Sequence, residues 1–228
     1  MVFSEYQLEV AGTLVRRVFG WMTLGLAITG ATAFGFGMVP GIQQFLKTNP
    51  SLMFILILAQ LGLVVYLSFG LQKMSSQTAI FSYLVYSFVT GITFSTLFTL
   101  FTLPSLAVTF MICAATFGAM ALYGLVTQSD LSGLGNYLFM GLIGLIISGV
   151  VTMFLKSSHV DFVTSIFGVI IFTLFTAYDV QMVKRFGLAL YSSGADMTKV
   201  SIISALKLYL DFVNLFLYLL RFFGQRRD

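Results

Sequence analysis

The chain has 228 residues, of which 58% are hydrophobic and only 9% are charged, and its mean hydropathy is +0.99. These values exclude an ordinary soluble globular domain, in which about a quarter of the residues are charged. The net charge of +4 comes from twelve scattered Lys and Arg residues, a pattern typical of loop charges that set membrane topology and not of a nucleic-acid-binding surface.

Four long runs contain no Asp, Glu, Lys or Arg: residues 18–46, 48–72, 74–129 and 131–155. Each can hold a membrane span of about 20 residues, and the third can hold two. The runs lack the alternation of a barrel strand, so we predict helices. The predicted spans are 17–38, 52–70, 79–101, 105–126, 134–155, 162–183 and 201–223. The sequence thus predicts an all-α polytopic membrane protein with a single seven-helix domain over residues 1–228.

Proline and glycine mark the joints between these spans, at Pro40, Pro50, Pro104 and the GLG sequence at 133–135. Most joints are short, so we expect neighbouring helices to be antiparallel. The longest joint is expected at roughly 184–200, which is polar and contains glycine. Small residues crowd the second half of the first span and predict a helix–helix interface there. They are Ala27, Gly30, Ala31, Ala33, Gly35 and Gly37.

The distribution of Lys and Arg predicts the orientation, because cytoplasmic loops are enriched in both. The N-terminal side carries Arg16, Arg17, Lys73, Lys184, Arg185 and Lys199. Over the first six spans the opposite side has only Lys47 and Lys156, which places the N-terminus in the cytoplasm. The last span is followed by a basic tail that opposes its full crossing, so the side of the C-terminus stays open.

Two acidic residues lie outside the predicted loops and tails: Asp179 in FTAYDVQMVKRF and Asp211 in LYLDFVNLFLYLLRFFG. Each costs roughly 2.5–3.5 kcal/mol on a membrane-insertion scale, so such residues usually face the interior of a bundle. At about 1.5 Å per residue, the two come within a turn or two of the same level. If they meet, burial and like-charge repulsion favour one shared proton, and the pair becomes a pH-responsive latch between the last two helices. The sign of the response does not follow from the sequence.

The last helix carries its polar residues on one stripe. Lys207, Asp211, Asn214, Tyr218 and Arg221 are spaced 4, 3, 4 and 3 and therefore share a helix face. The rest of the helix is essentially apolar, which predicts a place in the middle of the bundle. The alternative is a structural ion pair between Lys207 and Asp211, with Arg221 reaching the membrane interface. That alternative leaves Asp179 without a partner.

Other chemistry is sparse in this chain. His159 is the only histidine and Cys113 the only cysteine, which is too few ligands for a firm metal site and excludes an intramolecular disulfide. We see no haem, flavin or nucleotide signature, and expect no cofactor. The loops opposite the N-terminus offer only Asp161, so high calcium selectivity is not predicted.

The seven spans, the AYDVQ sequence at 177–181, the GIT at 91–93 and the terminal LYLDFVNLFLYLLRFFG resemble the transmembrane Bax inhibitor motif family. The resemblance implies two three-helix layers around a central C-terminal helix. It also implies a pH-sensitive calcium leak governed by Asp179 and Asp211, which calcium would contact transiently. Lys73 in GLQKMSS is the candidate alternative partner for Asp179. The short N-terminal tail is similar to bacterial members, which implies the bacterial inner membrane.

Several function classes stay open. The leading hypothesis is a calcium or cation leak channel in the lipid bilayer, with no enzymatic activity. Some bacterial relatives are linked to a membrane-bound ATP-dependent protease, so the alternative is a non-conducting regulator of such a protease or of a cell-death partner. An intramembrane aspartyl protease also needs two carboxylates, but Asp211 lies in YLD and not in a GxGD turn. A proton-coupled transporter is disfavoured because paired Gly or Pro breaks are missing.

Overall fold

The computed structural model describes residues 5–70, 73–155, 158–193 and 196–227. Their helices are α1 (Glu5–Gly37), α2 (Pro40–Thr48), α3 (Pro50–Gly70), α4 (Ser76–Phe94), α5 (Leu97–Leu100), α6 (Leu103–Val126), α7 (Leu134–Leu155), α8 (Ser158–Ser193) and α9 (Met197–Phe223). Seven helical segments are long and apolar enough to cross a membrane, and one of them joins α4 to α5. The predicted all-α, seven-span fold is confirmed.

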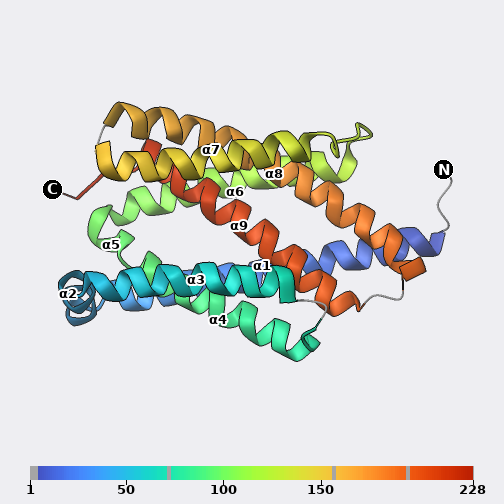
Figure 1. Cartoon of the computed structure of the whole chain (residues 1–228), viewed down its shortest axis with the longest axis horizontal. Helices are drawn as coiled ribbons and strands as arrows, with labels where there is room; N and C mark the ends of the chain where they lie inside the picture. Colours follow the sequence, from blue (N-terminus) through green and yellow to red (C-terminus); the bar gives the residue numbers. More distant parts are fainter. Residues whose placement is uncertain (1–4, 71–72, 156–157, 194–195, 228) are drawn as a thin grey trace.

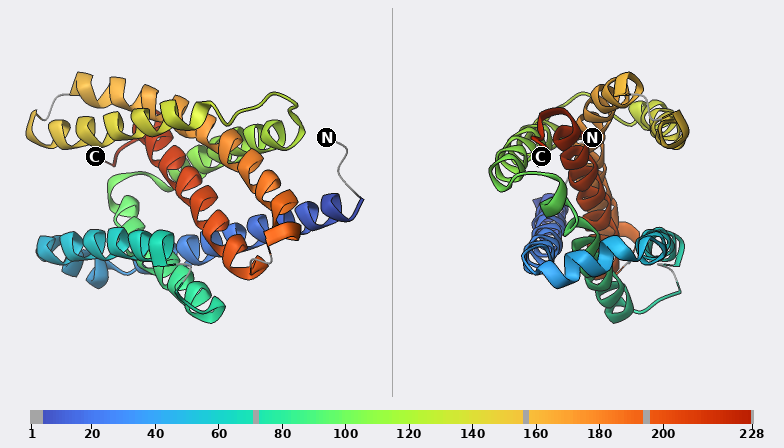
Figure 2. Two further views of the ribbon diagram at one scale, coloured as in Figure 1. Left: turned by 45° about the vertical axis from the view of Figure 1, so that its right-hand side comes forward. Right: turned by 90° about the vertical axis from the view of Figure 1, so that its left-hand side faces the viewer.

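The helices form two layers of three spans with α9 between them (Figure 1). One layer contains α1, α3 and α4, and the other contains α6, α7 and α8. The view along the bundle shows α9 crossing between the layers (Figure 2). In its most apolar stretch 61% of the residues are buried, against 39% or less in the other spans. The predicted central position of the last helix is therefore confirmed.

The last helix, α9, runs from one end of the bundle to the other, although the basic tail after it had opposed a full crossing (Figure 1). The two termini lie at opposite ends, which we call the N-terminal end and the C-terminal end (Figure 1). The tail after α9 is held to the α5–α6 connection by two backbone hydrogen bonds, from Thr102 N to Gln225 O (3.1 Å) and from Arg227 N to Leu100 O (3.0 Å). The start of α4 and the end of α8 also lie at the N-terminal end (Figure 1).

The predicted long joint at 184–200 is wrong, because α8 continues to Ser193. This stretch packs against the start of α1, where a Cβ at Gly187 would lie only 2.6 Å from Ala11 Cα. Leu190 is buried as well. Close backbone approach and burial keep the segment helical, although its polar composition suggested a loop.

Helix boundaries follow capping and proline chemistry. Pro40 and Pro104 lie in the first turns of α2 and α6, where a missing backbone N–H costs nothing. Asp196 caps α9, and its carboxylate accepts hydrogen bonds from the backbone N–H groups of Thr198 (2.8 Å) and Lys199 (3.4 Å). The Ser76 hydroxyl also donates to Asp196. These bonds, with that of Ser76 first, lower the pKa of Asp196.

The second half of the first span does form an interface, but most of its small residues do not lie in it. Ala27, Gly30, Ala31 and Gly35 are exposed, and only Ala33 among the six is fully buried. The close contact between α1 and α4 is instead made at Gly91 of α4, where a Cβ would lie 2.8 Å from Thr29 O. The number of small residues in a helix does not show which face packs against a neighbour. In α1 the face that packs against α4 is the one that carries Thr29 and Thr32.

Candidate functional site at the contact of α8 and α9

The two intramembrane carboxylates meet between α8 and α9. The side chains of Asp179 and Asp211 are in hydrogen-bonding contact. Their residues are 8% and 5% exposed, so both are shielded from lipid and from open solvent. Two carboxyl groups can share a hydrogen bond only when one of them carries a proton. The structure thus brings together the residues that the sequence predicted to meet.

The surroundings of the pair are asymmetric. Lys207 lies one turn before Asp211 on α9, where it interacts electrostatically with both carboxylates. Its side chain is itself exposed. Asp211 Oδ2 is buried, and no amide or hydroxyl group among the residues that the structure describes donates a hydrogen bond to it. This oxygen is an acceptor that could take a proton, a water molecule or a cation.

Apolar packing keeps lipid away from the carboxylates. Val180 and Val183 of α8 are buried beside Asp179, and Leu208 and Phe212 of α9 are buried beside Asp211. A charged group in such a setting costs several kcal/mol unless it shares a proton or finds a counter-charge. The packing therefore holds the pair where a net charge has a high energetic cost.

Gln181, two residues after Asp179, ties α8 to the α6–α7 connection. Its Oε1 accepts a hydrogen bond from Leu131 N (2.9 Å), and its Nε2 donates to Ser129 O (2.8 Å). Lys184 Nζ donates to Leu125 O near the end of α6 (2.8 Å). We did not predict these roles from the sequence. The available signal was a buried amide within a span, which needs hydrogen-bond partners.

Arg185 of α8 completes this attachment through an ion pair with Asp130, at 2.6 Å between Nη2 and Oδ1. Asp130 also accepts hydrogen bonds from the side chain and the backbone of Ser132. These bonds, together with Arg185, lower the pKa of Asp130 to about 2. The α6–α7 connection is thus held to the same helix that carries Asp179.

Lys73 lies in the turn before α4 and is exposed. Its backbone N–H donates to Gly70 O (3.0 Å). Within the described ranges, Lys207 is the lysine that interacts with Asp179 and Asp211. The role of Lys73 as an alternative partner for Asp179 stays a prediction.

The polar stripe of α9 is less hidden than its spacing suggested. Asn214 and Tyr218 are half-buried, and Lys207 and Arg221 are exposed. Asn214 satisfies its amide within its own helix, by donating to Leu210 O (2.7 Å). Polar groups that are paired locally tolerate partial burial, so the stripe does not need to face the innermost side of the helix.

The end of the stripe packs against α8. The Tyr218 ring stacks on Phe172, with 5.9 Å between ring centroids. Arg221 lies 5.5 Å from the centroid of Tyr218 and pairs with Asp161 at 3.3 Å. Arg221 is therefore paired with Asp161 at the C-terminal end. Its reach to the membrane interface stays a prediction.

The lone cysteine and histidine lie elsewhere. Cys113 is buried on α6, with its Sγ 3.5 Å from Phe212 O. His159 is exposed near the start of α8. No group of three or more His, Cys, Asp or Glu residues gathers within the part of the chain that the structure describes. Calcium, if it passes, therefore has no preformed cage of that kind here, and contact at the aspartate pair stays a prediction.

The model of one protein family, described as "Inhibitor of apoptosis-promoting Bax1", matches residues 11–228. The match includes both aspartates and all seven spans except the start of the first. The chain belongs to the Bax inhibitor family. The family assignment predicted from AYDVQ and the terminal helix is confirmed.

Relatives from several bacteria support the same assignment. The chain is 44% identical to the inner membrane protein YbhL of Escherichia coli strain K12, over 94% of this chain and 92% of that protein. It is 42% identical to an uncharacterized protein of Borreliella burgdorferi, over 99% and 97% of the two chains. A Deinococcus radiodurans relative is 36% identical over 99% and 95%. This Bax inhibitor family member is a multi-pass membrane protein similar over nearly its whole length to bacterial proteins.

Proposed function

We propose that this Bax inhibitor family member is a pH-sensitive leak channel of the bacterial inner membrane for calcium and other cations, with Asp179 and Asp211 as its gate. The contact of two buried carboxyl groups from neighbouring helices carries the proposal. Carboxylate oxygens are ligands that calcium prefers. The proposal assigns no catalysis and no cofactor to the chain.

The gate would work through the proton that the two carboxyl groups share. Loss of this proton places two like charges in contact where the dielectric is low, so they repel each other. Addition of a second proton removes the charge from the hydrogen bond between them and weakens it. Either change loosens α8 against α9 and opens a path for ions beside Asp211.

The likeness to an inner membrane protein of E. coli supports the host membrane. The Lys and Arg count supports a cytoplasmic N-terminal end. A cysteine introduced at Gln128 tests this orientation for the N-terminal end, and one at Gln44 tests it for the C-terminal end, because both side chains are exposed. The native Cys113 is buried and should not react. In intact cells an impermeant maleimide should label Gln44→Cys and spare Gln128→Cys. The reverse pattern would invert the topology.

Ion flux into liposomes tests the proposed function directly. The purified protein should carry calcium into liposomes that contain a calcium-sensitive dye, and the rate should change with pH. Protein-free liposomes are the control for passive leak. A folded, reconstituted protein that passes no ion at any pH would reject the channel and favour the non-conducting regulator of a membrane-bound protease.

A further inference from the structure

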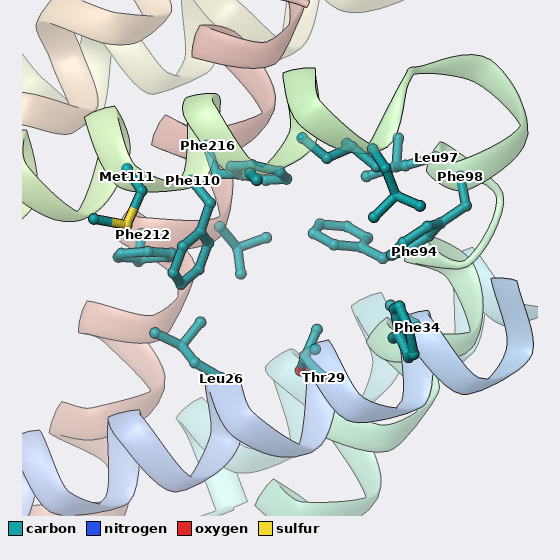
Figure 3. A pocket seen from close by; sticks show the side chains of 16 residues that line it. Leu26, Thr29, Phe34, Phe94, Leu97, Phe98, Phe110, Met111, Phe212 and Phe216 are labelled. Carbon is teal, nitrogen blue, oxygen red and sulfur yellow. The ribbon is translucent and has the colours of Figure 1, made fainter. Parts of the chain in front are cut away.

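An apolar cavity of about 390 Å³ lies between α1, α5, α6 and α9 (Figure 3), and neither Asp179 nor Asp211 lines it. Aromatic and aliphatic side chains line it, among them Leu26, Phe34, Phe98, Phe110, Met111 and Phe216. Thr29 is the one polar side chain of the lining, and its hydroxyl already bonds to Ser87 O (2.9 Å) and Tyr209 OH (2.7 Å). The volume is in the range of small-ligand sites, and the lining favours a hydrocarbon.

The cavity opens sideways to the membrane. Phe34 of α1 is 52% exposed and Met111 of α6 is 67% exposed on the outer surface of the bundle. Gly30 and Ala107 also line the cavity and are exposed, so small side chains leave its mouth open. Phe216 of α9 forms part of its inner wall (Figure 3). A lipid acyl chain in the bilayer can therefore reach the central helix between α1 and α6.

Basic side chains lie next to the cavity at the C-terminal end of the bundle. Arg227 Nη1 donates to the carbonyl of Phe98, a lining residue, at 2.8 Å. Arg226 is held beside it, because it pairs with Phe101 in an isolated antiparallel bridge. Both arginines are exposed. Phe34 and Phe98 meet edge to face at this end, with 6.0 Å between ring centroids.

We propose that this cavity binds one acyl chain of an anionic phospholipid, whose phosphate group lies against Arg226 and Arg227. An alkyl chain that fills the cavity makes van der Waals contacts with the lining, and an empty cavity leaves these contacts unmade. A guanidinium group binds phosphate oxygens with two parallel hydrogen bonds. Basic residues at a membrane surface also attract lipids with net negative charge. Neither aspartate of the proposed gate is among the residues that define this site.

Two glycine substitutions test whether the acyl chain enters the cavity. A Cβ at Gly30 or at Gly35 of α1 meets no atom within 4 Å, so leucine fits at both positions. Gly30 lines the cavity, and Gly35 does not. Gly30→Leu therefore fills the site, and Gly35→Leu is the matched control.

The probe is a phosphatidylglycerol with a photoreactive diazirine on its acyl chain, placed in nanodiscs of phosphatidylcholine with the whole protein. Mass spectrometry should map the crosslinks to residues 26–34 and 103–111. Gly30→Leu should reduce this labelling several-fold, and Gly35→Leu should leave it unchanged. Equal labelling of all lipid-facing helices, α3 included, would show a shell of bulk lipid only and would overturn the proposal. Unchanged labelling of Gly30→Leu would overturn it as well.

The headgroup is tested with the double variant Arg226→Gln/Arg227→Gln. The backbone hydrogen bonds of the tail stay available in this variant, so the tail should keep its place. The wild type should label more strongly with phosphatidylglycerol than with phosphatidylcholine that carries the same diazirine, and the double variant should lose this preference. Arg17→Gln, at the N-terminal end, should retain it. Equal labelling of the wild type by both lipids, or a protein dimer crosslinked through the cavity, would overturn the proposal.

Discussion

The carboxyl groups of Asp179 on α8 and Asp211 on α9 are in hydrogen-bonding contact inside the bundle, 32 positions apart in the sequence. The contact joins two neighbouring helices, and Lys207 precedes Asp211 by one turn of α9. Asp211 Oδ2 keeps an open acceptor position within the described part of the chain. In the proposed gate, a change in the protonation of this pair would act directly on the packing of the central helix.

Asparagine at either position of the pair should abolish the pH response of ion flux. Asp179→Asn and Asp211→Asn keep the shape and the hydrogen-bonding capacity of the side chain but remove a titrating proton. We expect calcium flux in liposomes to become nearly independent of pH in both variants. If both variants keep the pH profile of the wild type, the gate is not at this pair.

Asp130 provides a control carboxylate for that experiment. Ser132 and Arg185 lower its pKa to about 2, so it stays ionised at every pH at which liposomes are assayed. Because the pKa is depressed in the folded state, its stabilising effect is present above the ordinary value near 4 and is lost as the pH falls through about 2. Asp130→Asn should leave the pH profile of flux unchanged, and a shifted profile would show that the α6–α7 connection takes part in gating.

Gly124 of α6 should tolerate no side chain, because a Cβ there would overlap the backbone carbonyl of Ala177 on α8. We expect Gly124→Ala to lower the free energy of unfolding by about 1–3 kcal/mol, as overpacking does. Gly118→Ala on the same helix meets no atom within 4 Å and should be neutral or slightly stabilising. Unfolding by heat or denaturant in detergent measures both. Equal stability of the two variants would contradict the close α6–α8 contact.

Gln181 should contribute to stability through the α6–α7 connection. Gln181→Ala removes the acceptor of Leu131 N and the donor to Ser129 O. Leaving a buried polar group without its partner costs roughly 1–3 kcal/mol. The exposed Gln128 is the control, and Gln128→Ala should change the free energy of unfolding little. Hydrogen exchange of Leu131 N should also rise in Gln181→Ala alone; an unchanged rate would refute the attachment.

Asp196 should hold the start of α9 as its N-cap. Asp196→Ala removes the acceptor for the N–H groups of Thr198 and Lys199, so the melting temperature should fall. Asp196→Asn keeps a capping oxygen and should lower the melting temperature less than Asp196→Ala does. Because the carboxylate pKa is lowered, the stabilisation is present above the ordinary Asp value and is lost as the pH falls through the lowered one. A wild-type melting temperature in Asp196→Ala would refute the cap.

Much of the fold was predictable because a membrane span is identified by a run of consecutive apolar residues. Each charge-free run had to become a helix, since hydrocarbon leaves no partner for an unpaired backbone group. The cost of an acidic side chain in lipid likewise singled out Asp179 and Asp211. Length and composition failed at 184–193, where a polar stretch stays helical through contact with Ala11 of α1.

The sequence by itself determined the seven spans, the family and the two carboxylates, because hydropathy and the cost of buried charge belong to each residue. Only the tertiary structure decided which faces meet. It placed Gln181 and Arg185 on the α6–α7 connection, left Asn214 bonded to its own helix, and opened the cavity beside Gly30. These features depend on the rotation and crossing of packed helices, which small-residue counts and spacing do not specify.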